Sequence, residues 1–354
     1  MLKARVMRMW NGLRQRLASQ DSETAKNRGW KYWVLTLVIL VVTLWSALGL
    51  YWSNEPGYSD VAELAQRNAQ NNGQQAVVGY TTAFTLKHLT EAMLSKPGGY
   101  LSNDVTPPSI FMDNMPSWEF GVVIQLRDLS RALRKDMSRS QSQSTEDPDL
   151  AKAEPLLHFD HNSWMLPSTE GEYRNAVKLL DGYLNRLADP AQGNAQFYAR
   201  ADNLSSWLRD VETRLGSISQ RLSASVGQQR YNTDMAGETN ALQSTPTSDQ
   251  QQVKTARLQV DNIFYEARGS AWALIHILRA IEVDFAAVLE DKNATVSLQQ
   301  IIRELEETQA SIWSPIILNG NGFGLVANHS LVMANYISRA NAAIIDLRDL
   351  LENG

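Results

Sequence analysis

The sequence predicts an all-α protein: a single N-terminal transmembrane helix followed by an elongated helical bundle with coiled-coil-like packing. Three observations predict it. One apolar stretch near the start carries no charge. Five later stretches repeat apolar residues at alternating three- and four-residue steps, and none shows sustained two-residue alternation. The 354 residues include 44% apolar residues, enough for a sizeable core, and no cysteine, which excludes disulfides and thiolate sites.

Residues 1–31 form a basic segment. They carry eight Lys/Arg against Asp21 and Glu23, a net charge of +6, whereas the remainder of the chain carries −11. Positively charged flanks of membrane helices stay in the cytoplasm, so residues 1–31 are predicted to be a cytoplasmic tail. The acidic remainder lacks the clustered cations that phosphate binding needs, so we expect no nucleic-acid partner.

Residues 32–53 are predicted to cross the membrane. The twenty residues from Trp33 to Trp52 are uncharged, and at ~1.5 Å each they span ~30 Å, the thickness of the bilayer's apolar core. Two alternatives fit less well, because a buried soluble helix this long is rarely uncharged all round and a signal peptide has a shorter apolar region. Residues 54–354 would then lie outside the cytosol, which is the periplasm in a bacterium with two membranes.

The rest of the chain is predicted to be long helices. The five apolar seams, the last of which ends near the C-terminus, are Val122–Leu133, Tyr173–Leu187, Phe197–Val226, Val260–Val288 and Met333–Leu351. The second seam follows Pro167, with Thr169 and Glu172 at capping-box spacing. Extra apolar positions in the fourth seam favour a core within one chain. Packing between chains, and hence a homo-oligomer, stays open as the alternative. Polar composition predicts flexible loops near 138–153 and 227–252.

One short cluster has the side chains of a metal site. His158, Asp160 and His161 place two imidazoles and a carboxylate within four residues. They follow Pro155 in a loop-like region and lack the helical spacing of the H-E-x-x-H zinc motif. We therefore favour a structural or solvent-exposed role, and we expect no cofactor.

A proline-rich loop is the candidate partner-binding segment. Residues 104–116 contain three prolines, yet they also carry large apolar side chains, which folded chains either bury or use in contacts. The alternative is a loop packed on the bundle. The candidate contact residues are Ile110, Phe111, Met112 and Met115.

Three longer segments carry a family resemblance. They are YLSND (100–104) with PPSIFMDNMPSWEFG (107–121), LPSTEGEY (166–173) and NGNGFGLVANHSLVMANYISRANAAIIDL (319–347). Together they resemble a bacterial membrane-protein family filed as domain of unknown function 2333. The resemblance covers nearly the whole chain and implies a bacterial inner-membrane protein. It implies no activity and no site residues.

These observations favour a membrane-tethered periplasmic interaction protein, a scaffold or accessory subunit with protein partners in a cell-envelope complex. The tail is too small for an output domain, and one membrane helix cannot form a transport path alone. Two alternatives stay open. One is a periplasmic ligand-binding accessory protein, and the other is an envelope hydrolase acting on peptidoglycan or lipid. A hydrolase would need a nucleophile and an oriented base, and no G-x-S-x-G elbow occurs in the sequence.

Overall fold

The computed structural model describes residues 30–141, 143–189, 191, 193–231, 250–314, 316–320 and 325–353. It divides into two compact units, the first ending at Trp52 and the second beginning at Ser53. Each unit is described by itself. The predicted cytoplasmic tail lies, up to residue 29, outside the described residues.

The first unit contains one helix, Trp30–Trp52, whose mean hydropathy reaches 2.3. In the described part of the chain it is the one helix long and apolar enough to cross a membrane, and its most apolar stretch has no buried residue. Thr36 and Thr43 do not interrupt its apolar surface, because their hydroxyls donate to backbone carbonyls one turn earlier at 2.8 Å. The predicted segment 32–53 matches this helix to within two residues.

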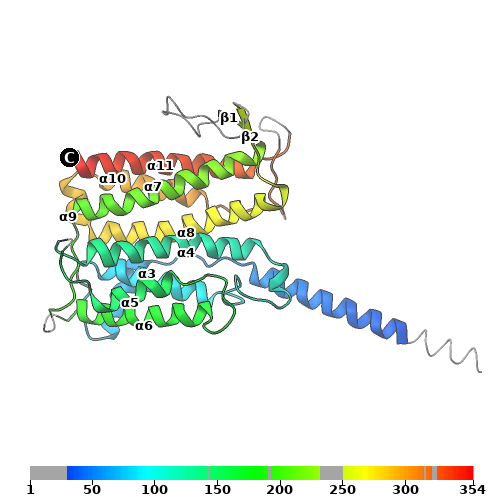
Figure 1. Cartoon of the computed structure of the whole chain (residues 1–354), viewed down its shortest axis with the longest axis horizontal. Helices are drawn as coiled ribbons and strands as arrows, with labels where there is room; N and C mark the ends of the chain where they lie inside the picture. The colour runs from blue at the N-terminus through cyan, green and yellow to red at the C-terminus, as the bar shows by residue number, and fades with distance from the viewer. Residues whose placement is uncertain are drawn as a thin grey trace, which may run out of the picture. The chain divides into compact units, whose positions relative to one another are not determined.

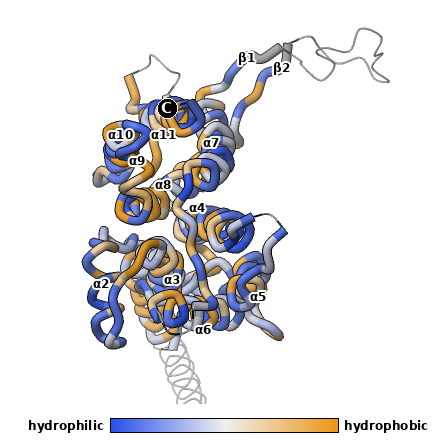
Figure 2. The backbone as a smooth tube through the Cα atoms, turned by 90° about the vertical axis from the view of Figure 1, so that its left-hand side faces the viewer, coloured by the Kyte–Doolittle hydropathy of each residue, from blue (hydrophilic) through white to orange (hydrophobic). Residues whose placement is uncertain are grey.

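The second unit is a bundle of helices that run alternately up and down (Figures 1 and 2). The helices are α2 (Val61–Asn71), α3 (Tyr80–Ser95), α4 (Asn114–Ala132), α5 (Pro148–Leu157), α6 (Thr169–Leu187), α7 (Ala201–Ser223), α8 (Val260–Asp284), α9 (Ala286–Asp291), α10 (Thr295–Glu307) and α11 (His329–Asn353). The strands β1 (Gln228–Tyr231) and β2 (Gln250–Val253) pair antiparallel, with Gln228 opposite Val253. The all-α prediction is confirmed.

Each of the five predicted seams contains a helix, but Phe197–Arg200 of the third seam precede α7 and Phe285 of the fourth separates α8 from α9. Helix α6 is capped by Ser168, one residue before the predicted Thr169. The sequence did not reveal α2, α3, α5 or α10. The predicted loop 138–153 is partly wrong, because residues 148–153 begin α5: the Asp147 carboxylate caps the helix and Leu150 is buried. The other predicted loop, 227–252, includes β1 and most of β2, and its residues 232–249 lie outside the described part.

Helices α4 and α8 form the centre of the bundle. Viewed along the helices, α7, α10 and α11 lie on one side of this pair, and α3, α5 and α6 on the other (Figure 2). Two glycines allow the close crossing: a Cβ on Gly121 would lie 2.1 Å from the Glu266 carbonyl oxygen, and one on Gly269 would lie 2.0 Å from that of Trp118. The Ser270 hydroxyl donates to the Gly121 carbonyl across the same contact.

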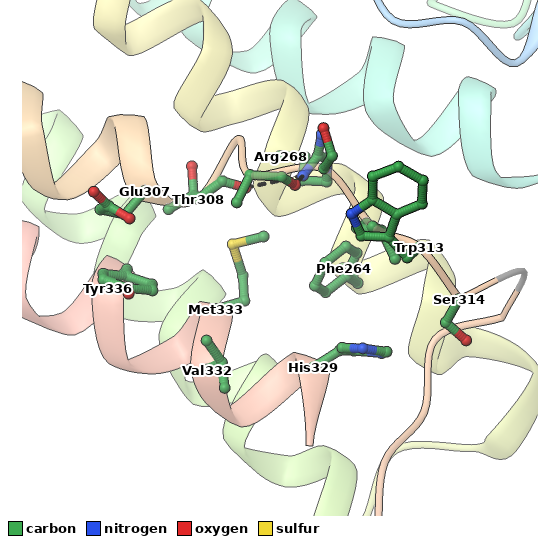
Figure 3. Close-up of a pocket in the computed structure, with 13 residues that line it drawn as sticks. Phe264, Arg268, Glu307, Thr308, Trp313, Ser314, His329, Val332, Met333 and Tyr336 are labelled. Carbon is green, nitrogen blue, oxygen red and sulfur yellow. Dashed lines mark hydrogen bonds between the residues drawn. The ribbon is translucent and has the colours of Figure 1, made fainter. Parts of the chain in front are cut away.

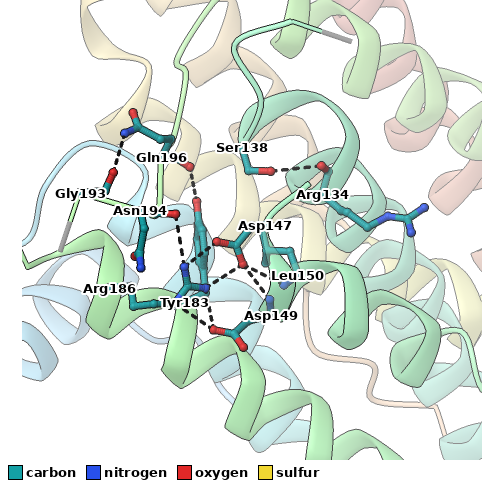
Figure 4. A network of polar contacts seen from close by, with 10 residues as sticks. All are labelled: Arg134, Ser138, Asp147, Asp149, Leu150, Tyr183, Arg186, Gly193, Asn194 and Gln196. Carbon is teal, nitrogen blue, oxygen red and sulfur yellow. Dashed lines mark hydrogen bonds and ion pairs between the residues drawn. The ribbon is translucent and has the colours of Figure 1, made fainter. Parts of the chain in front are cut away.

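The two ends of the bundle differ. We call "polar end" the end where α4 and α6 finish and α5 and α7 begin. There Arg186 donates to both Asp147 and Asp149, at 2.6–3.1 Å, and joins α6 to the start of α5 (Figure 4). The Tyr183 hydroxyl donates to the Gln196 carbonyl beside it. Polar contacts therefore close this end.

Candidate functional site

The opposite end, which we call the loop end, is where α3, α5, α7 and α10 finish and α4, α6, α8 and α11 begin. The segments that connect them are residues 96–113, 158–168, 253–259 and 308–328. Among the described residues, the large apolar side chains that these segments leave exposed are Val105, Ile110, Phe111, Trp164, Met165, Leu166, Val253, Leu258, Trp313, Ile316, Leu325 and Val326. Isolated exposed apolar residues are ordinary, but so many at one end make the loop end the candidate functional site.

These segments are also poor in charge. No Asp, Glu, Lys or Arg occurs in residues 105–112, 161–169 or 308–328. Loops in contact with water usually carry polar and charged side chains, since their backbone and side chains face solvent. The loop end therefore combines exposure with an apolar composition in three separate segments.

A buried ion pair holds the first connecting segment, residues 96–113. The Lys96 ammonium lies 2.8 Å from the Glu119 carboxylate, and both side chains are fully buried. Glu119 also accepts hydrogen bonds from the backbone N–H groups of Leu101 and Ser102. Burial raises the pKa of Glu119, while Lys96 and these hydrogen bonds act in the opposite direction. The start of the segment is thus fixed to α4 from inside the fold.

The first and second segments are fixed to one another. Asn103 donates to the Ser163 carbonyl at 2.8 Å and to the Glu170 carboxylate, and the Tyr100 hydroxyl donates to the His161 carbonyl at 2.7 Å. Near this contact Leu166 is 89% exposed and has a φ of 58°. A leucine in the left-handed region is strained, and burial within the chain does not compensate it here.

The fourth connecting segment, residues 308–328, is fixed to the entry segment, residues 53–60, with which the second unit begins. The Arg268 guanidinium donates to the Glu55 carboxylate at 2.7 and 2.9 Å and to the carbonyls of Thr308 and Ala310, both at 3.0 Å. Both charged side chains are largely buried, at 8% exposure for Arg268 and 17% for Glu55. Residues 53–55 therefore belong to the loop end.

A pocket of about 330 Å³ opens between α8, α11 and the fourth segment (Figure 3). Its walls are mostly apolar, with Phe264 on α8, Met333 on α11 and Trp313 on the loop. Trp313 is 95% exposed, so the pocket is open rather than enclosed. Arg268 also lines it, but this guanidinium is already engaged by Glu55 and two carbonyls.

The predicted metal-site residues follow α5, where the chain turns toward α6. The His158 ring bonds to the Glu154 carbonyl through Nδ1 at 3.0 Å. The His161 ring packs against Phe120, with its Nδ1 3.8 Å from the Asp160 carboxylate. Burial lowers the pKa of His161. In the described part of the chain no three His, Asp or Glu side chains are grouped as metal ligands.

The predicted partner loop is divided between surface and core. Ile110 is 56% exposed and Phe111 76%, whereas Met112 is half-buried. Met115 is only 2% exposed, because it already belongs to α4 and faces the bundle core. The burial of Met115 contradicts its predicted place on the surface, and the candidate contact residues that remain accessible are Ile110, Phe111 and, in part, Met112.

One serine–histidine pair lies in the second unit. The Ser59 hydroxyl is 3.0 Å from His88 Nε2, and the Ser59 backbone N–H donates to His276 Nε2 at 3.1 Å. Burial lowers the pKa of both imidazoles. Neither Ser59 nor His88 lines the pocket described above. Through His88 and His276, Ser59 joins the entry segment to α3 and α8, so these three residues stabilise the fold.

The loop-end residues that sequence reasoning missed are Trp164, Leu166, Leu258, Trp313 and Leu325. For all of them except Leu258, which follows Lys254 and Arg257, the available signal was the absence of charged residues around them. The apolar seams indicate only the helices between these segments. The proline-rich segment was found because its composition is unusual on its own. The other segments are distinguished only by the structure, which places their exposed apolar side chains at the same end of the bundle.

The chain belongs to the family described as an uncharacterized protein conserved in bacteria (DUF2333), whose model matches residues 24–354. This confirms the resemblance found in the sequence. Neither a curated protein nor a solved structure matches the chain. The family match covers the apolar helix as well as the whole bundle.

Proposed function

We propose that this protein is a membrane-tethered helical interaction protein of the bacterial envelope, acting as a scaffold or accessory subunit of an envelope complex. The helix Trp30–Trp52 crosses the inner membrane, with the basic tail in the cytoplasm and the bundle in the periplasm. The observation that carries the proposal is the loop end: the segment that joins the apolar helix to the bundle is fixed there by Glu55 and Arg268, among exposed apolar loops.

This arrangement suits a protein that holds a rigid surface close to the membrane. Ser53–Asp60 does not form a loose linker, since Glu55 bonds to Arg268 and Ser59 bonds to His276. A flexible linker would let the bundle move away from the membrane. An enclosed apolar pocket would favour the ligand-binding alternative, but the pocket beside Trp313 is open. The Ser59–His88 pair does not line that pocket, so the pocket gives the hydrolase alternative no support.

Topology is the first test. Because the chain has no cysteine, Ser19→Cys and Val296→Cys each introduce a single thiol, and Val296 is 74% exposed on α10. In intact spheroplasts, a membrane-impermeant maleimide should label Val296→Cys and should reach Ser19→Cys only after lysis. Labelling in the reverse order would refute the proposed orientation.

Complex formation is the second test. The full chain, solubilised from native membranes in a mild detergent, should migrate with a fixed set of partners in a native gel. In the reciprocal experiment, purification of each partner should co-purify this chain. Migration of the chain alone, or only with copies of itself, would contradict the role of a scaffold or accessory subunit.

A further inference from the structure

We infer that the loop end docks directly on the lipid surface of the membrane in which the chain is anchored. The inference rests on the proposed membrane tether and names the partner of the apolar loops: the interfacial layer of the bilayer. Leu258 and the described residues of three segments make the contact: Val105–Met112, His161–Ser168, and the stretches 309–314, 316–320 and 325–328. The bundle then stands on the membrane and leaves its sides and polar end free for other proteins.

The covalent chain is the first support. Glu55 follows Trp52 by three residues, which together extend over at most about 11 Å whatever the direction of the apolar helix. Glu55 is fixed to Arg268, and Arg268 is fixed to Thr308 and Ala310. Trp313 follows Ala310 by three residues. If the helix ends at the membrane surface, these loops cannot be far from it.

The kinds of side chain are the second support. The exposed residues of the loop end include two tryptophans, a phenylalanine and several leucine and isoleucine side chains, which favour the boundary between headgroups and acyl chains. At the polar end, the apolar side chains left exposed in the described residues are all valines, namely Val77, Val78, Val283 and Val296. A surface selected for water alone has no reason to place its largest apolar groups at one end.

Charge is the third support. Leu258 is 85% exposed, and Lys254 and Arg257 beside it are exposed as well. Cations next to an apolar anchor suit the anionic headgroups of a bacterial membrane. The three apolar segments carry no Asp or Glu that these headgroups would repel. A protein partner would not require this absence of charge in all three segments.

Rigidity is the fourth support. The loops are held from inside by Lys96 with Glu119, and from one loop to the next by Asn103. Leu166 keeps a strained backbone while its side chain projects outward. Preorganised loops lose little conformational freedom on binding, so a modest apolar area suffices for docking.

The test uses the full chain in vesicles of phosphatidylethanolamine and phosphatidylglycerol. Single cysteines replace Phe111, Leu166 or Trp313, with Val296→Cys as the matched exposed control on α10, and each carries an environment-sensitive fluorophore. Lipids with a nitroxide just below the headgroup should quench the three loop-end probes at least threefold more than the control probe. Quenching equal to the control would overturn the inference.

Two further readouts separate the alternatives. If iodide in the water fails to reach the loop-end probes but the nitroxide lipids also fail to quench them, a second copy of the chain covers the surface and lipid docking is wrong. In a Leu258→Cys probe, replacing Phe111, Leu166 and Trp313 together by Asp should abolish lipid quenching, whereas Val296→Asp should not. Alkaline carbonate extraction of the same vesicles tests the tether separately, because release of the chain would refute the membrane helix while the probes still report on docking.

Discussion

The two ends of the bundle are closed by different means. At the polar end Arg186 links the buried Asp147 to Asp149, and the large apolar side chains exposed among the described residues there are valines (Figure 4). At the loop end the charges that hold the fold are inside, as Lys96 with Glu119 and Arg268 with Glu55, while apolar side chains face outward. An end that only faces water has no need of such large exposed apolar side chains. The comparison is the basis of the proposal that the loop end meets an apolar surface.

Breaking the buried Lys96–Glu119 pair of the loop end should give the largest loss of stability. Lys96→Met leaves the Glu119 carboxylate buried without its cation, so we expect a loss of about 4 kcal/mol in unfolding free energy. Denaturant unfolding of the full chain in detergent measures it. Adding Glu119→Gln should restore part of the loss. Arg67→Met, which removes an exposed pair with Glu63, should stay within about 0.5 kcal/mol of wild type. An equally small change for Lys96→Met would contradict a loop end held from inside.

Two residues of the proline-rich segment 104–116, Phe111 and Met115, should differ in their contribution to stability. Met115→Ala should cost about 3 kcal/mol, because it opens a cavity at a buried position of α4. Phe111→Ala should cost less than about 0.5 kcal/mol, because its ring is already exposed. The same unfolding measurement compares them. A loss of 3 kcal/mol for Phe111→Ala would mean that this ring is packed, and it would remove Phe111 from the docking surface.

The ion pair of the polar end should show a smaller loss than that of Lys96. Arg186→Met deprives Asp147, whose side chain is 4% exposed, and Asp149 of their shared cation, so we expect about 2–3 kcal/mol. Hydrogen bonds to Asp147 raise the pKa of Arg186, which keeps it charged. Arg200→Met, at an exposed pair of the same end, is the control and should change stability by less than about 1 kcal/mol. If Arg186→Met exceeded Lys96→Met, the contrast between the two ends would fail.

Acid should weaken the middle of the bundle, where the entry segment meets α8. Burial lowers the pKa of His276 to about 4 from an ordinary value of 6.5, and its Nε2 accepts the Ser59 N–H. Between those pH values the unfolded chain binds a proton that the folded chain does not, so stability falls as pH falls. We expect this group to remove about 2 kcal/mol between pH 7.5 and 5.

The variant His276→Gln isolates this contribution. Burial also lowers the pKa of His88 and His161, so they add a loss of the same sign in both proteins. The difference between wild type and variant, measured by unfolding at several pH values, should therefore report His276 alone. A pH dependence that is identical in the two proteins would show that His276 is not held neutral by the fold.

Part of the fold could be predicted because its signals are local. An apolar stripe at helical spacing, such as Val260–Val288, states which face of a helix is buried without reference to any partner. Helix α3 lacks such a stripe: it contains four threonines, and Thr82, Thr85 and Thr90 are buried together with its apolar residues. Two of these hydroxyls are satisfied by carbonyls of the same helix, and the third by Asp284 of α8. Helix α3 is buried on all sides over most of its length, so its sequence has no continuous polar face, and only the tertiary structure shows that it is a helix.

The sequence by itself determined the apolar helix near the N-terminus, the all-α class, the five seams and the exposed part of the proline-rich loop. Each of these depends on composition or periodicity within one short segment. The tertiary structure alone decided that Phe111, Leu166 and Trp313 share one end, because the alternating direction of the helices brings together segments far apart in the chain. It also placed Met115 in the core, because this residue belongs to the first turn of α4 and is buried there, where a composition-based argument sees only another apolar residue of the loop.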